Sequence, residues 1–248
     1  MKLRGNTILI TGGGSGIGEA LAHRFHDLGN TIIIAGRGQD RLEKAAAGRA
    51  NIIPITLDVT DNQAIKAFSH RVVVEHPALN VLINNAGITR FEEVDRSHDL
   101  TVMEETITTN LLGPIRLTNA LIDHLVGRQN AAIVNVTSGL AFVPLVAAPT
   151  YGASKAAIHS YTVCLREALK HRVEVIEVVP GPVATEINRG RDNLGGNQPL
   201  EEFIDEVLAQ FEKQPTPTEI LVSRSAGARF AERDGHFEHV LQLINTRH

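Results

Sequence analysis

Cysteine is almost absent from this chain of 248 residues. The single cysteine, Cys164, cannot form a disulfide within the chain, and such sparing use of cysteine is typical of a reducing compartment. Cys164 lies in a helical pattern, where a small side chain of this kind usually belongs to the core. We therefore predict a buried, structural Cys164.

Long apolar runs are absent as well. No stretch approaches the roughly 18 consecutive apolar residues of a membrane-spanning helix. The opening sequence MKLRGNTILIT lacks the apolar core and the cleavage site of a signal peptide. We therefore expect a soluble, cytoplasmic protein without a membrane partner.

The chain also lacks a basic run. Its net charge is −4, with Lys and Arg scattered among Asp and Glu, which argues against nucleic acid or a membrane surface as a partner. A neutral small molecule or a nucleotide remains open. No internal repeat, low-complexity tract or linker divides the chain before about residue 186, and 43% of its residues are hydrophobic. One α/β domain over residues 1–248 is expected.

Glycine, in contrast, is concentrated near the N-terminus. A short β-branched run, Thr7–Thr11, is followed by five glycines between Gly12 and Gly18 and then by a helical pattern. Glycine lets a backbone approach a ligand closely, and the amides of a helix N-terminus attract a pyrophosphate. The spacing Gly12-x-x-x-Gly16-x-Gly18 departs from the commoner G-x-G-x-x-G pattern, so a bare turn is the alternative interpretation.

A second buried strand, residues 30–35, leads to Gly36-Arg37 and a helix over residues 40–49. The adenosine ribose of a dinucleotide binds at this point of an α/β fold. An acid here would bind a free 2′-hydroxyl, whereas Arg37 suits a 2′-phosphate. This favours NADP(H) over NAD(H), and a solvated arginine is the alternative.

Polar residues follow the next two strands. The strand at 52–57 ends in Asp58-Val59, and Thr60 is a candidate cap for a helix over residues 61–75. Asp58 is a candidate partner for an adenine amino group, or else a turn residue. The strand at 81–83 runs into Asn84-Asn85-Ala86-Gly87, a loop that keeps the backbone near a cofactor or simply forms a turn.

A long helix over residues 100–125 is expected to contain Asn110 in a mainly apolar stretch. Helix interiors disfavour asparagine, and Gly113-Pro114 should bend or interrupt the helix. Asn110 is therefore a candidate for orienting a water or a lysine, with a satisfied core asparagine as the alternative.

Tyr151 and Lys155 lie four residues apart at the start of a helix and project from one face. A nearby ammonium stabilises a phenolate and lowers the pKa of a tyrosine, which makes Tyr151 a candidate general acid–base. Ser138 follows the strand at 132–137 and could hydrogen-bond the substrate oxygen. Taken alone, the pair is also compatible with a buried tyrosine and a solvated lysine.

The last third of the chain predicts a sixth strand at 173–179, which ends in the run PGPVAT over residues 180–185. Thr185 is a candidate for contacting a nicotinamide amide or a phosphate, or for capping a helix. A polar, glycine-rich segment follows and predicts a mobile substrate lid over about residues 183–213. A helix over 200–213, a brief strand at 220–222 and an amphipathic stretch near 237–244 are expected after it.

Together these residues resemble the short-chain dehydrogenase/reductase family from Thr11 to about Thr185. The resemblance rests on motifs in the family's order and spacing: TGGGSGIG at 11–18, Asp58-Val59, NNAG at 84–87, Asn110, Ser138, Tyr151-x-x-x-Lys155 and PGPVAT at 180–185. It implies a single Rossmann-type, doubly wound parallel sheet with NAD(P)(H) along its C-terminal edge.

The resemblance also implies a role for each matching position. Tyr151 would be the acid–base, Lys155 would lower its pKa and hold the nicotinamide ribose, Ser138 would position the carbonyl, and Asn110 would support a water-linked relay to Lys155. Hydride would pass between the nicotinamide and a carbonyl carbon. The implied cofactor-binding residues are Gly12, Ser15, Gly16, Ile17, Gly18, Arg37, Asp58, Val59, Asn85, Ala86, Gly87, Tyr151, Lys155, Pro180, Gly181, Val183 and Thr185.

Two features depart from the family pattern. Position 15 is Ser15, where NADP-preferring members often have a basic residue, so that Arg37 alone carries the preference and NAD(H) stays possible. The chain after the strand at 220–222 differs from the family's usual short glycine-rich ending. Family tetramers often use that last strand, so both a homodimer and a homotetramer are open.

The substrate is expected to be a ketone or aldehyde with a hydrophobic part, because the loop at 139–149 is apolar. Fatty-acyl thioesters, sugars and steroids all remain open. A serine hydrolase is disfavoured because no G-x-S-x-G occurs. The pairs His23/His26 and His236/His239 lack a third ligand, so no metal site is predicted. The main alternative is an NADP(H)-binding redox sensor that acts through a protein partner.

Overall fold

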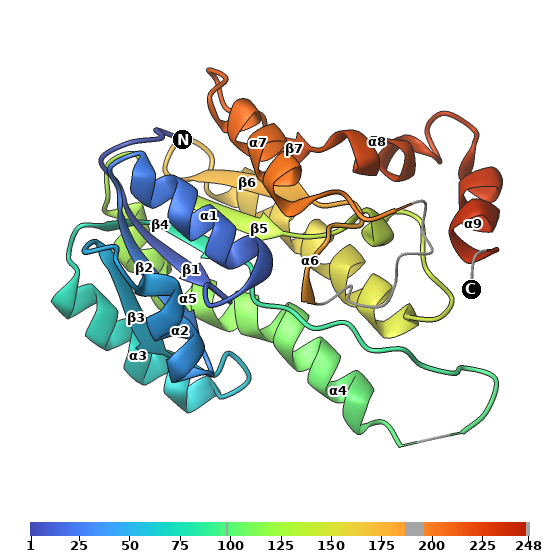
Figure 1. Cartoon of the computed structure of the whole chain (residues 1–248), viewed down its shortest axis with the longest axis horizontal. Coiled ribbons are helices and arrows are strands. Elements are labelled where there is room, and N and C mark those ends of the chain that lie inside the picture. Colours follow the sequence, from blue (N-terminus) through green and yellow to red (C-terminus); the bar gives the residue numbers. More distant parts are fainter. Residues whose placement is uncertain (98, 187–195, 247–248) are drawn as a thin grey trace.

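The computed structural model describes residues 1–97, 99–186 and 196–246. Its centre is a seven-stranded parallel sheet with the strand order β3-β2-β1-β4-β5-β6-β7 (Figure 1). The strands are β1 Thr7–Thr11, β2 Thr31–Gly36, β3 Ile52–Thr56, β4 Leu79–Asn84, β5 Ala132–Val136, β6 Glu174–Val179 and β7 Glu219–Leu221. The predicted Rossmann-type, doubly wound parallel sheet is confirmed.

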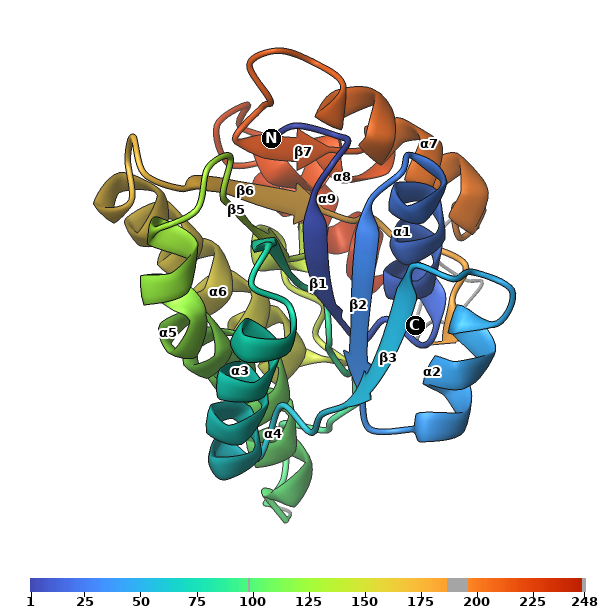
Figure 2. The same cartoon turned by 90° about the vertical axis from the view of Figure 1, so that its left-hand side faces the viewer.

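Helices cover both faces of this sheet (Figure 2). The first face carries α1 Gly16–Asp27, α2 Gln39–Ala46 and α7 Leu200–Phe211, and the second carries α3 Asn62–Glu75, α5 Gly113–Val126 and α6 Pro149–Ala168. Because both faces are covered, the strands are nearly continuous apolar runs, as in TILIT of β1 and TIIIAG of β2. On the first face, Phe25 of α1 and Phe211 of α7 pack edge to face with ring centres 5.7 Å apart.

The strand order reverses between β1 and β4, because β2 and β3 lie on one side of β1 and β4 to β7 on the other. In doubly wound sheets, the crevice at the carboxyl ends of the strands beside such a reversal is the usual ligand site. The glycine-rich turn after β1 and the loop after β4 both lie there. The fold thus places the two loops next to each other.

Two local predictions are wrong. Cys164 is exposed on α6, because the buried residues of that helix follow other positions of the helical repeat. Thr60 does not cap α3; instead Asp61 is the N-cap, and its carboxylate accepts hydrogen bonds from the backbone amides of Gln63 at 2.8 Å and Ala64 at 3.1 Å. Thr60 donates its hydroxyl hydrogen to Asp58.

The predicted helix over residues 100–125 is divided into three parts. They are α4 Thr101–Ile107, a π-helical turn Thr108–Leu112 that contains Asn110, and α5. Gly113 and Pro114 open α5, and the amide of Gly113 bonds back to the oxygen of Thr108 in the π-helical turn. The predicted irregularity therefore lies on Asn110 rather than beyond it.

The C-terminal part adds two short helices, α8 Ser223–Phe230 and α9 Phe237–Asn245, which extend beyond β7 (Figure 1). Residues 187–195 of the predicted lid lie outside the described residues. Of the rest of that segment, α7 buries Phe203, Ile204, Val207 and Phe211 in the core against α1. The lid itself stays a prediction.

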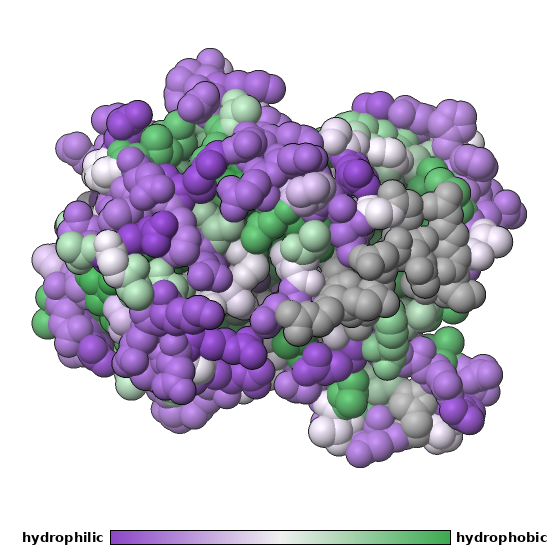
Figure 3. Space-filling view, viewed as in Figure 1, coloured by the Kyte–Doolittle hydropathy of each residue, from purple (hydrophilic) through white to green (hydrophobic). Residues whose placement is uncertain are grey.

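Most of the surface seen in Figure 3 is polar, with apolar residues in small scattered groups, in keeping with the mixed charges of the sequence. Among the described residues, no helix combines the length and the apolar character needed to cross a bilayer.

Candidate active site

At Gly12 and Gly18, the glycine-rich turn after β1 leaves no room for a side chain. Gly12 has a φ of +68°, and its amide donates a 2.7 Å hydrogen bond to the carbonyl oxygen of Ala35. A Cβ at Gly12 would lie 2.9 Å from Nδ2 of Asn85, and one at Gly18 would lie 2.3 Å from the oxygen of Gly12. The turn therefore holds the start of α1 directly against the end of β1.

The N-terminus of α1 faces the space above this turn. Ser15 is the N-cap residue in an extended conformation, and within the described residues its side chain makes no capping hydrogen bond. Gly16 has a φ of +55°, and the methyl group of Thr185 would lie 3.4 Å from a Cβ there. Uncapped amides at a positive dipole end, beside glycine, fit a pyrophosphate. Ile17 anchors the helix by packing on the core.

Thr11 fixes the loop after β4 to the glycine-rich turn. Its buried hydroxyl oxygen accepts hydrogen bonds from the amides of Asn85 at 3.0 Å and Ala86 at 3.1 Å. Nδ2 of Asn85 in return donates to the carbonyl oxygen of Thr11 at 2.9 Å. The predicted residues Gly12, Asn85 and Ala86 are thus brought together. Sequence analysis missed the linking role of Thr11, although it opens the TGGGSGIG motif.

Arg37 and Asp58 lie at the ends of the next strands along the edge. Arg37 is exposed after β2, and its Nη1 is 3.8 Å from a carboxylate oxygen of Glu105. Oδ1 of Asp58 accepts from the amide of Thr60 at 2.9 Å and from its hydroxyl at 2.8 Å, which is the contact of a turn residue. Val59 packs closely on α5, since its backbone oxygen would lie 3.0 Å from a Cβ at Gly113.

Lys155 is the best-defined member of the predicted catalytic group. Its buried Nζ donates a 2.9 Å hydrogen bond to the carbonyl oxygen of Val136 and lies 5.7 Å from the ring centre of Tyr151. Burial lowers the pKa of Lys155 from 10.5 to about 8, because desolvation disfavours the ammonium. The amine therefore gives up its proton more readily than an exposed lysine does, and it lies beside the Tyr151 ring.

Asn110 is buried beside this lysine. Its Oδ1 accepts from the amide of Ile88 at 2.8 Å, and its Nδ2 donates to the oxygen of Ile88 at 2.9 Å and to Oγ of Ser154 at 3.2 Å. Ser154 in turn donates to the carbonyl oxygen of Tyr151 at 2.7 Å. A Cβ at Gly87 would lie 3.3 Å from Oδ1 of Asn110 and 3.6 Å from Nζ of Lys155. Gly87, Asn110 and Lys155 are thus neighbours.

Ser138 follows β5 in an extended conformation and is mostly buried. Its Oγ accepts a 3.1 Å hydrogen bond from the amide of Leu140, and the amide of Gly139 donates to the oxygen of Pro180 at 2.8 Å. The segment after β6 therefore lies beside Ser138. Gly181 packs against Arg224 of α8, and buried Val183 forms a bridge with Gln198.

The structure thus joins most of the predicted residues along one sheet edge. Contacts link Gly12 to Asn85, Gly16 to Thr185, Gly87 to both Asn110 and Lys155, and Gly139 to Pro180. Arg37 and Asp58 have other partners. Arg37 lies near Glu105 of α4, and Asp58 accepts a hydrogen bond from Thr60 in its own turn. Sequence analysis also missed Ser154, whose place inside the run YGASK was the available signal.

Fold and site together define a dinucleotide-binding α/β protein with a tyrosine–lysine pair at the switch-point edge. The family model for short chain dehydrogenases matches residues 6–193, and the chain belongs to the short-chain dehydrogenase/reductase family. The chain is accordingly an oxidoreductase that interconverts a carbonyl and an alcohol by hydride transfer with NAD(P)(H).

Several relatives are similar over most of the chain. An uncharacterized oxidoreductase DltE of Bacillus subtilis is 39% identical, covering 100% of this chain and 99% of its own. The 3-oxoacyl-[acyl-carrier-protein] reductase FabG of Thermotoga maritima is 34% identical over 75% of this chain and 77% of its own. A solved short chain dehydrogenase from Burkholderia cenocepacia in complex with NADP has a TM-score of 0.83 at 28% identity, covering 97% of this chain and 98% of its own.

Proposed function

We propose that Tyr151 is the general acid–base of a carbonyl reductase that prefers NADP(H), with Lys155, Ser138 and Asn110 as its partners. The observation that carries this proposal is the position of Lys155. Its buried amine lies near the Tyr151 ring and is hydrogen-bonded to the strand end that leads to Ser138. One contact therefore ties the acid–base pair to the residue proposed to hold the substrate oxygen.

Each side chain has a separate task in the reductive direction. Tyr151 donates its phenolic proton to the carbonyl oxygen as negative charge develops there. The Lys155 ammonium stabilises the resulting phenolate. Ser138 already accepts a hydrogen bond from Leu140, so its own hydroxyl hydrogen can be donated to the substrate oxygen. Asn110 holds the loop at Ile88 beside Lys155 and supports the return of a proton to the pair.

The bound dinucleotide supplies the hydride, and the chain supplies the place for it. The glycine turn with Ser15, Gly16, Ile17 and Gly18 would hold the pyrophosphate. Asp58 and Val59 would meet the adenine, and Asn85 to Gly87 the adjoining ribose. Pro180, Gly181, Val183 and Thr185 would hold the nicotinamide end.

Arg37 supports the preference for NADP(H), because an exposed guanidinium at the end of β2 matches a 2′-phosphate. The Burkholderia cenocepacia neighbour is described as a complex with NADP, which agrees with this preference. NAD(H) is the competing cofactor, since Ser15 adds no positive charge.

The apolar segment 139–149 supports a ketone or aldehyde with a hydrophobic part as the substrate. A cytoplasmic location, a homodimer or homotetramer and a lid over about residues 183–213 complete the proposal. They rest on the sequence arguments given above.

The test is NADPH and NADH oxidation by the purified protein with a panel of aldehydes, ketones and diketones. Tyr151→Phe is expected to lower kcat by about 100-fold or more, the usual contribution of general acid–base catalysis. Tyr161→Phe is the matched control, because the second tyrosine of the chain lies on the same helix and should be dispensable. Turnover with NADH only would contradict the NADP(H) preference. Tight NADPH binding without turnover on any carbonyl would contradict the reductase.

A further inference from the structure

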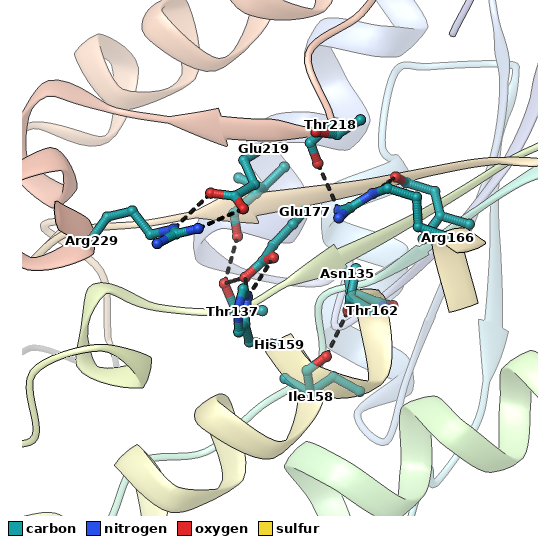
Figure 4. A network of polar contacts seen from close by, with 12 residues as sticks. Asn135, Thr137, Ile158, His159, Thr162, Arg166, Glu177, Thr218, Glu219 and Arg229 are labelled. Atoms are coloured by element: carbon teal, nitrogen blue, oxygen red, sulfur yellow. Dashed lines mark hydrogen bonds and ion pairs between the residues drawn. The ribbon is translucent and has the colours of Figure 1, made fainter. Parts of the chain in front are cut away.

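A fully buried carboxylate lies just behind the catalytic group. Glu177, in the middle of β6, is 0% exposed. Its Oε1 accepts a 2.7 Å hydrogen bond from the hydroxyl of Thr137, and Nδ1 of His159 lies 2.8 Å from Oε2 and 3.0 Å from Oε1 (Figure 4). A carboxylate only accepts hydrogen bonds, so Nδ1 of His159 carries the hydrogen. An unpaired charge here would be strongly destabilising, which explains why both partners are present.

The two partners of Glu177 adjoin the residues proposed to perform catalysis. Thr137 directly precedes Ser138 on the chain. His159 lies one helical turn beyond Lys155 and two beyond Tyr151, so all three share one face of α6. The Glu177 carboxylate therefore joins the strand end that carries Ser138 to the helix face that carries Tyr151 and Lys155.

An outer layer fixes the direction of the histidine ring. Phe142 packs edge to face on His159 with ring centres 4.8 Å apart, and the Arg229 guanidinium lies 4.6 Å from the centre of the Phe142 ring. Arg229 of α8 also forms a two-pronged ion pair with Glu219 of β7, at 2.7 and 2.9 Å (Figure 4). The imidazole is thus held between the carboxylate and the segment that follows Ser138.

We propose that Glu177 is a positioning residue that sets the separation of the Ser138 hydroxyl and the Tyr151 phenol through Thr137 and His159. This inference rests on the proposed function, in which one substrate oxygen must meet both groups. Such geometry is sensitive, since a misplacement of about 1 Å can cost roughly 100-fold in rate. Neither Glu177 nor His159 belongs to the motifs that carried the family resemblance.

The chain offers a matched control for a purely structural role. Asn135 of β5 donates a 2.8 Å hydrogen bond to Thr162 of α6, which is also 0% exposed (Figure 4). This second buried contact joins the same strand to the same helix, three residues before Ser138 on the chain. Its loss should lower stability without a selective effect on catalysis.

The experiment compares Thr137→Val, Thr137→Ser, Glu177→Gln and Thr162→Val by kcat, KM, NADPH affinity and Tm. Thr137→Val and Glu177→Gln are expected to lower kcat about 10- to 100-fold at unchanged NADPH affinity. Thr137→Ser should stay near the wild type, because it keeps the hydroxyl. Thr162→Val should lower Tm and leave kcat within about 2-fold. If Glu177→Gln fails to fold, the milder pair Thr137→Val and Thr137→Ser still decides the question.

A double-mutant cycle with Ser138→Ala isolates the path of the effect. If Glu177 acts through Ser138, the loss caused by Glu177→Gln or Thr137→Val should shrink below about 3-fold in the Ser138→Ala protein. Losses that simply multiply, or a fall in Tm with unchanged kcat, would overturn the inference. Full activity of Ser138→Ala itself would be a different result: it would contradict the role of Ser138 in the proposed function, and this inference with it.

Discussion

Lys155 Nζ donates a hydrogen bond of 2.9 Å to the backbone oxygen of Val136, two residues before Ser138. The contact orders the amine, although it leaves a buried ammonium with a neutral partner. A backbone carbonyl compensates only part of the lost hydration, because the carbonyl dipole is much weaker than a carboxylate. The protein therefore keeps this charge next to Tyr151 at a cost in stability.

That cost predicts a pH-dependent stability. The pKa of Lys155 falls from 10.5 in the unfolded chain to about 8 in the fold, which corresponds to about 3 kcal/mol. Between these values the unfolded chain holds more protons, so the contribution of Lys155 to the unfolding free energy rises from about pH 8 to about pH 10.5. Below pH 8 the full cost applies.

Chemical unfolding of the cofactor-free protein and of Lys155→Met at several pH values measures this effect. Lys155→Met should have a higher unfolding free energy than the wild type at pH 7. The difference between the two unfolding free energies should fall by up to about 3 kcal/mol towards pH 10.5. Titrating groups remote from Lys155 are present in both proteins and cancel in the difference, and adding Tyr151→Phe to both proteins removes the phenol beside the amine. A difference in unfolding free energy that does not change with pH would show that the amine is not desolvated.

The glycine turn predicts a loss of dinucleotide binding in Gly12→Ala. The new methyl group would meet Nδ2 of Asn85 at 2.9 Å and push the loop after β4 away. Gly48→Ala is the matched control: Gly48 also has a positive φ, +74°, but nothing lies within 4 Å of its Cβ position. Both variants lose about 1–2 kcal/mol to backbone strain. Only Gly12→Ala should weaken NADPH binding in a fluorescence titration, by about 10-fold or more; equal affinities would rule out the proposed pyrophosphate site.

Arg37 predicts the choice between the two nicotinamide cofactors. Arg37→Ala should lower kcat/KM with NADPH by about 10- to 100-fold, the value of a lost charge-assisted hydrogen bond, and leave kcat/KM with NADH nearly unchanged. Arg71→Ala is the control. Arg71 is about as exposed as Arg37 and is also paired with a glutamate, Glu75, on the helix α3. A parallel loss with both cofactors would show that Arg37 acts on folding rather than on the 2′-phosphate.

The contacts of Asn245, in the C-terminal helix α9, predict an effect of this residue on substrate binding. Oδ1 of Asn245 accepts a 2.7 Å hydrogen bond from the amide of Val146, and its Nδ2 donates to the oxygen of Pro144 at 3.1 Å. These contacts hold both sides of a turn in the segment that follows Ser138. Asn245→Ala should therefore raise KM for the carbonyl substrate about 3- to 10-fold, as expected for the loss of about 1 kcal/mol, at unchanged NADPH affinity.

Thr246→Ala controls for a general loosening of α9. The hydroxyl of Thr246 bonds only to the oxygen of Gln242 among the contacts described, inside the same helix. If KM rises equally in both variants, or does not rise in Asn245→Ala, the contacts of Asn245 do not position the substrate segment.

Local signals were enough to predict the strands, and the resemblance to the family added the doubly wound parallel sheet. Apolar runs such as TILIT and NTIIIA identify buried parallel strands, and the glycines after the first of them identify the turn into a helix. Each of these patterns depends on neighbouring residues only. The order of the site residues along the sheet edge then follows from the fold, since parallel strands end at the same edge.

The remaining errors and omissions depend on packing between distant segments. Cys164 was predicted to be buried because a helical pattern does not say which face meets the sheet. The π-turn at Asn110 adds one residue to a helix and leaves no trace in hydrophobic spacing. Glu177 resembles an ordinary strand residue in the run VEVIEVVP, because its partners Thr137 and His159 are remote in sequence.

The dinucleotide pocket and the substrate segment obtain their contacts at different stages of synthesis, because Asn245 lies in the helix α9. The glycine turn and its partners Thr11 and Asn85 lie within the first 85 residues to be translated, whereas the turn at Pro144–Val146 waits for α9, near the last residues described. A chain that stops before α9 would therefore retain the contacts of the dinucleotide pocket and lack the brace of the substrate segment.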